Sequence, residues 1–199
     1  MEFKKIVMNR YSCRAYQDKK VPEETIRELL EMIVYSASAI NLQPWRIRVV
    51  SDPELKAQLR TVAFDQPHVE SCSHLLVLCA DSDYAAIIAK FEKSLIEAEA
   101  PEEVRNRLVG MAKGFSSGMT PEQQLTWSQN QVHIAVGNAI NGAYSLGLAS
   151  CPMTAFEPAE FSRMLELPAH IVPTVLVAVG YPADEFMGKM RYPLEEVLI

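Results

Sequence analysis

The sequence has few cysteines and histidines, and none of them forms a recognisable metal or redox motif. The four cysteines show no Cys-x-x-Cys pair and no neighbouring histidine at ligand spacing; they are Cys13, Cys72, Cys79 and Cys151. The four histidines are scattered along the chain. This pattern is typical of buried, reduced thiols, so we expect no metal centre and no metal catalysis.

Long apolar runs and an excess of positive charge are also absent. No apolar stretch approaches the length of a transmembrane helix, and a formal net charge of −6 leaves no basic stripe for nucleic acid. Residues 1–5 lead directly into an amphipathic pattern, without the apolar core and cleavage site of a secretory signal. We therefore expect a cytoplasmic protein that binds neither a membrane nor nucleic acid.

The apolar residues predict a single α+β domain over residues 1–199. Residues 3–10 and 22–35 have helical spacing, residues 45–49 alternate as in a half-buried strand, and residues 75–80 and 174–180 are continuously apolar, as in strands buried on both faces. Prolines 53, 121 and 158 open further helices, and the second of these helices is expected to reach residue 146. The polar, glycine-containing stretch of about 101–121 predicts a mobile helical excursion. Helices outnumber strands and do not alternate with them one for one, which favours α+β.

Basic side chains recur at alternate positions after the first predicted helix. Arg10, Ser12 and Arg14 point the same way if this segment is extended. Two guanidiniums and a hydroxyl suit a phosphate dianion, although a solvated basic turn fits the segment taken alone. A second basic pair, Lys189 and Arg191, favours the phosphate site, because the rest of the chain is acidic.

Four short motifs follow one another along the chain. They are Arg10-x-Ser12-x-Arg14, Ser36-x-Ser38-x-x-Asn41-x-Gln43-Pro44-Trp45, Gly147-Leu148 followed by Pro152, and Lys189-x-Arg191. Together they resemble the FMN-dependent nitroreductase family, of the oxygen-insensitive NAD(P)H type, over nearly the whole chain. The resemblance implies a mainly antiparallel central sheet wrapped by helices, in a homodimer with two flavins at the interface. It also implies that residues 193–199, in a swapped tail of about 189–199, add a strand to the partner's sheet.

The resemblance implies a phosphate site within one subunit. Arg10, Ser12, Lys189 and Arg191 would hold the FMN phosphate, and Tyr11 belongs to the same segment. Arg14 would lie beside the pyrimidine edge of the flavin, where a cation stabilises the negative charge that hydride transfer places on the ring. A surface ion pair of Arg14 with residue 18 or 24 is the alternative.

Further flavin contacts follow from the same resemblance. A partner segment would approach the ribityl chain and ring through Ala37, Ser38, Ala39 and Asn41, and a loop passing the flavin N5 would contain Pro152, Thr154 and Ala155. Many family members have an acidic residue and a glycine at the last two of these positions, so a backbone N–H is the expected contact there. Gln66, rather than Asp65, is the expected amide beside the ring. Cys151 is interpreted as a packed bystander, and no catalytic acid or base is assigned.

These expectations lead to a functional hypothesis. The chain would use NADH or NADPH and bound FMN to reduce nitroaromatics, quinones or related small acceptors, with donor and acceptor using one pocket in turn. Flavin or dihydropteridine reduction, or other chemistry on the same fold, is a second hypothesis. A non-catalytic flavin-binding module is a third hypothesis. The presence of all four expected phosphate-binding residues argues against it; they are Arg10, Ser12, Lys189 and Arg191.

Overall fold

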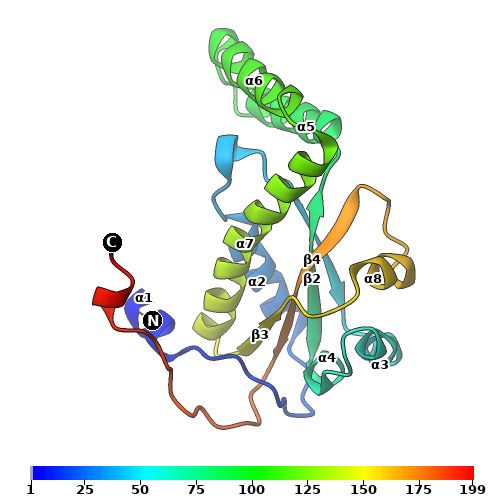
Figure 1. Cartoon of the computed structure of the whole chain (residues 1–199), viewed down its shortest axis with the longest axis vertical. Coiled ribbons are helices and arrows are strands. Elements are labelled where there is room, and N and C mark those ends of the chain that lie inside the picture. Colours follow the sequence, from blue (N-terminus) through cyan, green and yellow to red (C-terminus); the bar gives the residue numbers. More distant parts are fainter. Residues whose placement is uncertain (1) are drawn as a thin grey trace.

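The computed structural model describes residues 2–199 and contains one four-stranded sheet (Figure 1). The strand order is β1-β2-β4-β3, and every neighbouring pair is antiparallel. The strands are β1 (Trp45–Val50), β2 (His74–Asp81), β3 (Ala149–Met153) and β4 (Ile171–Gly180). This arrangement confirms the expected α+β class with an antiparallel sheet.

Helices account for most of the remaining chain. They are α1 (Phe3–Asn9), α2 (Glu23–Val34), α3 (Pro53–Thr61), α4 (Pro67–Ser71), α5 (Tyr84–Glu97), α6 (Glu102–Ser117), α7 (Pro121–Ser145) and α8 (Pro158–Met164), with 3-10 turns η1 (Ala39–Asn41) and η2 (Leu194–Glu196). The predicted starts at positions 53, 121 and 158 are confirmed. Pro22 was expected to be the first helical residue of α2. It is the N-cap instead, because its ψ of 141° is extended. The polar stretch of about 101–121 forms α6 and the first residue of α7.

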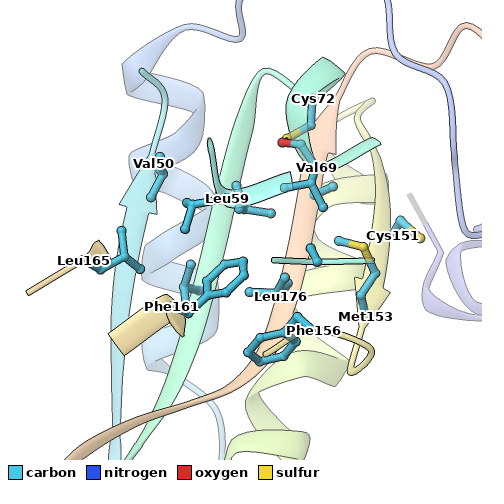
Figure 2. Close-up of a cluster of buried hydrophobic side chains, with 14 of the residues drawn as sticks. Val50, Leu59, Val69, Cys72, Cys151, Met153, Phe156, Phe161, Leu165 and Leu176 are labelled. Atoms are coloured by element: carbon cyan, nitrogen blue, oxygen red, sulfur yellow. The ribbon is translucent and has the colours of Figure 1, made fainter. Parts of the chain in front are cut away.

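Alternation along β2 divides the core into two layers. All eight of its residues are buried, as the continuous apolar run predicted. Leu75 and Val77 face a cluster that includes α3, α4 and α8, with Phe161 fully buried at its centre (Figure 2). Leu76 and Leu78 face the other cluster, which α2 and α7 cover (Figure 1). Successive side chains of a strand point to opposite faces, so one apolar run supports both layers.

The central helix α7 is closely packed against α2. A Cβ atom on Gly142 would lie 3.0 Å from both Leu29 Cδ1 and Met32 Sδ, so a side chain here would require the ends of these side chains to shift. Its N-terminus is fixed by a capping box between Thr120 and Gln123. This helix packs against β3 and also against β2 and β4.

The two edges of the sheet differ. The outer edge of β3 is covered by the N-terminal segment, through a bridge between Ser12 and Ser150. Within residues 2–199, the other edge strand, β1, pairs only with β2. The C-terminal residues expected to form a strand have no strand partner in residues 2–199; Leu194–Glu196 form a 3-10 turn after Pro193 instead. That strand was expected to pair with the partner's sheet, which a single chain does not contain, so it stays a prediction; a strand needs a neighbour to satisfy its backbone groups. Among the described residues, no helix is long and apolar enough to span a membrane.

Candidate functional site

The segment after α1 runs beside the segment that leaves β4 (Figure 1). Gln17 donates its backbone N–H to the carbonyl of Tyr181 at 2.9 Å, and Ala183 donates to the carbonyl of Ala15 at 2.8 Å. On the other side, Cys13 donates to the carbonyl of Ser150 at 3.1 Å. The basic residues that flank these segments are therefore brought together, although they are about 180 positions apart in the sequence.

Three cations gather at this place. Arg10 immediately follows α1, and the Lys189 ammonium donates to the backbone carbonyl of Val7. Burial and then the Arg191 guanidinium lower the pKa of Arg10, and burial followed by the charges of Arg10 and Arg191 lowers the pKa of Lys189. None of the three forms an ion pair with a carboxylate of residues 2–199. Like charges held close without a counter-ion form a site for an anion.

A cavity of about 260 Å³ opens beside Arg10. Its wall is made by the C-terminal turn of α7, the start of β3 and the segment after α1; the lining residues are Arg10, Tyr11, Tyr144, Gly147, Leu148, Ala149, Ser150 and Pro182. Gly147 has a φ of 75°, a left-handed conformation that a side chain would disfavour. The turn from α7 into β3 thus fits this glycine of the third motif.

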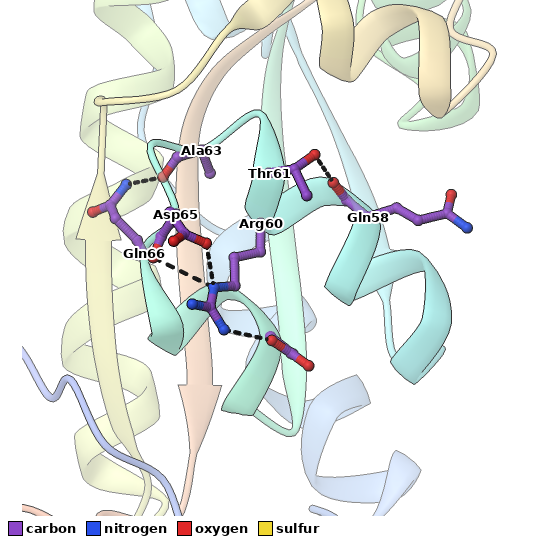
Figure 3. Close-up of polar contacts among 7 residues, drawn as sticks. Gln58, Arg60, Thr61, Ala63, Asp65 and Gln66 are labelled. Carbon is purple, nitrogen blue, oxygen red and sulfur yellow. Dashed lines mark hydrogen bonds and ion pairs between the residues drawn. The ribbon is translucent and has the colours of Figure 1, made fainter.

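Gln66 lies next to the expected N5 loop. Its side-chain amide donates to the carbonyl of Ala155 at 2.8 Å and to that of Ala63 at 2.9 Å. Asp65 instead pairs with Arg60 at 2.9 Å (Figure 3), so its carboxylate is already engaged. Gln66 therefore contacts the loop after β3, whereas Asp65 contacts Arg60, and the expected flavin contact of Gln66 stays a prediction.

The expected N5 loop begins later than predicted. Pro152 belongs to β3, where it pairs with Val177, and only Thr154 and Ala155 lie in the exposed loop that follows. Placing Pro152 in a loop was therefore wrong. A proline is tolerated here because β3 is a short strand at the side of the sheet, where a missing N–H leaves no neighbouring strand without its donor.

Ser12 and Arg14 are exposed on the same stretch of chain, and Cys13 between them is buried. Arg14 forms no ion pair with Asp18 or with any other carboxylate of residues 2–199, so the surface-pair alternative is not realised. Burial raises the pKa of Cys151, and a buried neutral thiol is a poor nucleophile. Cys151 fits the role of a packed bystander. All four cysteines are free and buried, as predicted.

The segment expected to come from the partner lies apart from the cation cluster in this chain. Ala39–Asn41 form the light-blue turn η1, which lies well above α1 in the view of Figure 1. Asn41 lines a different cavity, of about 430 Å³, together with Trp45 and Phe91. Ala39 donates its backbone N–H to the Gln131 side chain at 2.9 Å, and Ser38 accepts from the Gln43 N–H, also at 2.9 Å. Within one subunit these residues and the cations do not share a pocket.

Two residues of the site were missed by sequence reasoning. Asp184 hydrogen-bonds to the Tyr11 hydroxyl at 2.9 Å, and Phe186 packs against the Tyr11 ring at a centroid distance of 5.3 Å. In the sequence, their position between β4 and Lys189 was the only feature that could have indicated that they belong to the site. Within residues 2–199, no cluster of three or more His, Cys, Asp or Glu side chains could hold a metal ion.

Comparisons with known proteins agree with this architecture. The Nitroreductase family model matches residues 7–181. A Thermus thermophilus protein named NADH dehydrogenase is 37% identical over 199 residues, covering 100% of this chain and 96% of the relative. The Aliivibrio fischeri major NAD(P)H-flavin oxidoreductase is 27% identical, and the alignment covers 96% of this chain and 94% of that protein.

Solved structures share the fold. An FMN complex from Exiguobacterium sibiricum, described as a nitroreductase, superposes with a TM-score of 0.92 at 24% identity, covering 100% of this chain and 97% of the other. The names of these proteins agree with the predicted enzyme class, an oxidoreductase, and with the predicted cofactors, FMN and NAD(P)H. Because the family model matches most of the chain and the fold agrees over its whole length, the chain belongs to the nitroreductase family.

Proposed function

We propose that this chain is an FMN-dependent oxidoreductase that uses NAD(P)H to reduce nitroaromatics, quinones or related small acceptors. The observation that carries the proposal is the cluster of Arg10, Lys189 and Arg191 without a carboxylate partner in residues 2–199. A phosphate monoester supplies two negative charges and several acceptor oxygens, which matches three cations and the nearby Ser12 hydroxyl. Family membership supports FMN as the source of that phosphate.

Each residue of the site has a binding or orienting role in this proposal. Arg10, Ser12, Lys189 and Arg191 hold the phosphate. The unpaired guanidinium of Arg14 stabilises negative charge on the ring, and the backbone after β3 approaches the ring at residues 154–155. Bound FMN supplies the hydride-accepting and hydride-donating chemistry. The chain contributes no acid or base to this step.

The Gln66 side chain has an orienting part. By donating to the carbonyl of Ala155 it links the loop after β3 to the start of α4. The loop is exposed, and a hydrogen bond from a neighbouring helix start is what holds it. This contact supports a site in which backbone N–H groups, and not a carboxylate, meet the ring.

The proposed active unit is a homodimer. Exposed apolar side chains gather on α1 and the C-terminal tail; they are Phe3, Val7, Met8, Met190, Tyr192, Leu194, Val197, Leu198 and Ile199. So many exposed apolar groups are typical of an interface. The partner's tail would cover the open edge of β1 and the apolar cavity beside it, and the partner's residues 37–41 would complete each flavin site. The reduced thiols also support the proposed cytoplasmic location.

Flavin reduction is the second candidate function. It is favoured by the similarity to an NAD(P)H-flavin oxidoreductase. In that case a second, freely exchanging flavin is the acceptor, and the same phosphate cluster serves a resident FMN. Saturable turnover with free FMN, at a rate above that with quinones, would favour this candidate.

Two-substrate kinetics test the proposed function. We expect purified protein to oxidise NADH or NADPH in the presence of a quinone or a nitroaromatic. Double-reciprocal plots at several fixed acceptor concentrations should be parallel, because the donor product leaves the pocket before the acceptor enters. Intersecting lines would contradict a shared pocket, and a protein that binds FMN but shows no turnover would be a non-catalytic binding module.

A further inference from the structure

Asp184 lies where the two arms of the cation cluster meet. One arm is the segment after α1, with Arg10 and Arg14, and the other is the segment after β4 that leads to Lys189. The carboxylate of Asp184 accepts from the Arg14 backbone N–H at 2.7 Å, from the Tyr11 hydroxyl at 2.9 Å and from the Cys13 thiol at 3.0 Å. Three residues of one arm, Tyr11, Cys13 and Arg14, therefore donate to one side chain of the other arm.

The chemistry of these contacts is that of a structural clamp. All three donors are neutral, and Asp184 forms no ion pair with a cation of residues 2–199. Burial acts to raise the pKa of Asp184, but hydrogen bonds from Arg14, Cys13 and Tyr11 outweigh it and lower the pKa overall. The carboxylate thus stays ionised, and its charge is used to bind the backbone of the arm and not to neutralise the cations.

The Cys13 thiol is suited to this donor role. Burial, followed by the hydrogen bond to Asp184, raises its pKa to about 12, so the sulfur keeps its proton at neutral pH. Cys13 is completely buried and also contacts the carbonyl of Ala15 at 3.1 Å. The proton that binds Asp184 is therefore always present under physiological conditions.

A contact that holds the two arms together is needed because the like charges of the cation cluster repel one another. Burial and then the Arg191 charge lower the pKa of Arg10, and burial followed by the charges of Arg10 and Arg191 lowers the pKa of Lys189, as like charges held close predict. Besides the Asp184 contacts, the arms meet at the backbone hydrogen bonds Gln17–Tyr181 and Ala183–Ala15, at the Tyr11–Phe186 ring contact and at the hydrogen bond from Lys189 to Val7. The two backbone hydrogen bonds lie beyond Arg14, so without the carboxylate the Tyr11–Arg14 stretch loses three of its contacts to the arm that carries Lys189.

We propose that Asp184 is a positioning residue that fastens the Tyr11–Arg14 segment to the segment carrying Lys189 and Arg191, and so sets the geometry of the phosphate cluster. The inference rests on the proposed function, since it concerns the same FMN phosphate. It assigns to Asp184 no contact with the cofactor. Its action is through Tyr11, Cys13 and Arg14.

The test compares binding of FMN and of riboflavin, which lacks the phosphate. In Asp184→Asn the side chain keeps its shape, but one acceptor oxygen becomes an NH₂ donor, so either the Arg14 N–H or the Tyr11 and Cys13 donors lose their acceptor. We expect the dissociation constant of FMN to rise about tenfold or more, and that of riboflavin to change less than about threefold. Asp18→Asn is the matched control; Asp18 is an exposed carboxylate of the same stretch, and both ligands should bind to it as to the parent.

The two ligands separate positioning from a general loss of structure. If Asp184→Asn weakens FMN and riboflavin equally, or weakens neither, the proposed role of Asp184 is wrong. If the parent protein itself does not prefer FMN to riboflavin, the phosphate cluster is wrong and this inference falls with it. Should Asp184→Asn not fold, Tyr11→Phe removes one donor and keeps the ring contact with Phe186. That variant should also lower the preference for FMN, and an unchanged preference would overturn the inference.

Discussion

A protein that lacks residues 193–199 is expected to lose bound FMN and to become monomeric or aggregate. This is the largest effect we predict. The truncated chain still contains Arg10, Lys189 and Arg191, so the loss of FMN would not come from missing phosphate-binding residues. Leu194, Val197 and Leu198 are each 65% exposed in the single chain. Burying such side chains against a partner stabilises an assembly by about 1.5–3 kcal/mol for each one that is fully buried. In a symmetric dimer every contact occurs twice, so the loss is doubled.

Sedimentation and the flavin-to-protein ratio measure this outcome. The double variant Glu195→Gln and Glu196→Gln is the matched control, since it changes charge in the same tail and leaves the apolar side chains in place. It should remain dimeric and keep FMN. A truncated monomer that holds stoichiometric FMN would show that the flavin site is built within one subunit, and the shared-site proposal would then be wrong.

Arg191→Ala is expected to weaken FMN binding by roughly one to two orders of magnitude. A hydrogen bond to a charged group is worth about 1.5–3 kcal/mol, which corresponds to this range of affinity. Arg191→Lys keeps the charge and loses the planar fork, so we expect an intermediate dissociation constant. Riboflavin should bind to all three proteins alike.

Fluorescence titration of the flavin-free protein measures these constants. Arg27→Ala is the matched control, because Arg27 is an exposed arginine on α2 whose partner is Glu31 of the same helix, at 3.4 Å. It should leave the affinity for FMN unchanged. Equal FMN affinity in Arg191→Ala and in the parent would remove Arg191 from the phosphate site.

Much of the fold was predictable because its signals are local. The continuous apolar run at 75–80 could only be a strand covered on both faces, and β2 is buried throughout. The Asp52-Pro53 pair predicted the start of α3, and Asp52 accepts the Leu55 N–H at 2.7 Å. Such patterns depend on neighbours within a few positions, which a single sequence contains.

Other features were not predictable because their causes lie far along the chain. Strand β3 is short and contains a proline, and its pairing with β4 gives it a strand conformation that its own composition does not indicate. Asp184 contacts residues about 170 positions upstream, and nothing in its local sequence marks it. The conformation of the tail likewise depends on a neighbour that the single chain does not supply.

The candidate site shows the same division. Residue types and spacing predicted the convergence of Arg10 and Lys189, because alternating basic residues in an acidic chain indicate an anion-binding site. The choice of Gln66 over Asp65 as a flavin contact stays a prediction; the structure shows that Gln66 contacts Ala155 of the loop after β3. The clamp at Asp184 required the structure.

The central claim is that the cation cluster holds the phosphate of FMN. It is tested most directly by titrating the unmodified, flavin-free protein with FMN and with riboflavin under the same conditions, at low and at high salt. We predict that FMN binds at least about tenfold more tightly at low salt, and that the difference narrows as salt screens the phosphate. Equal affinities for the two flavins, or a preference for FMN that does not change with salt, would contradict the account.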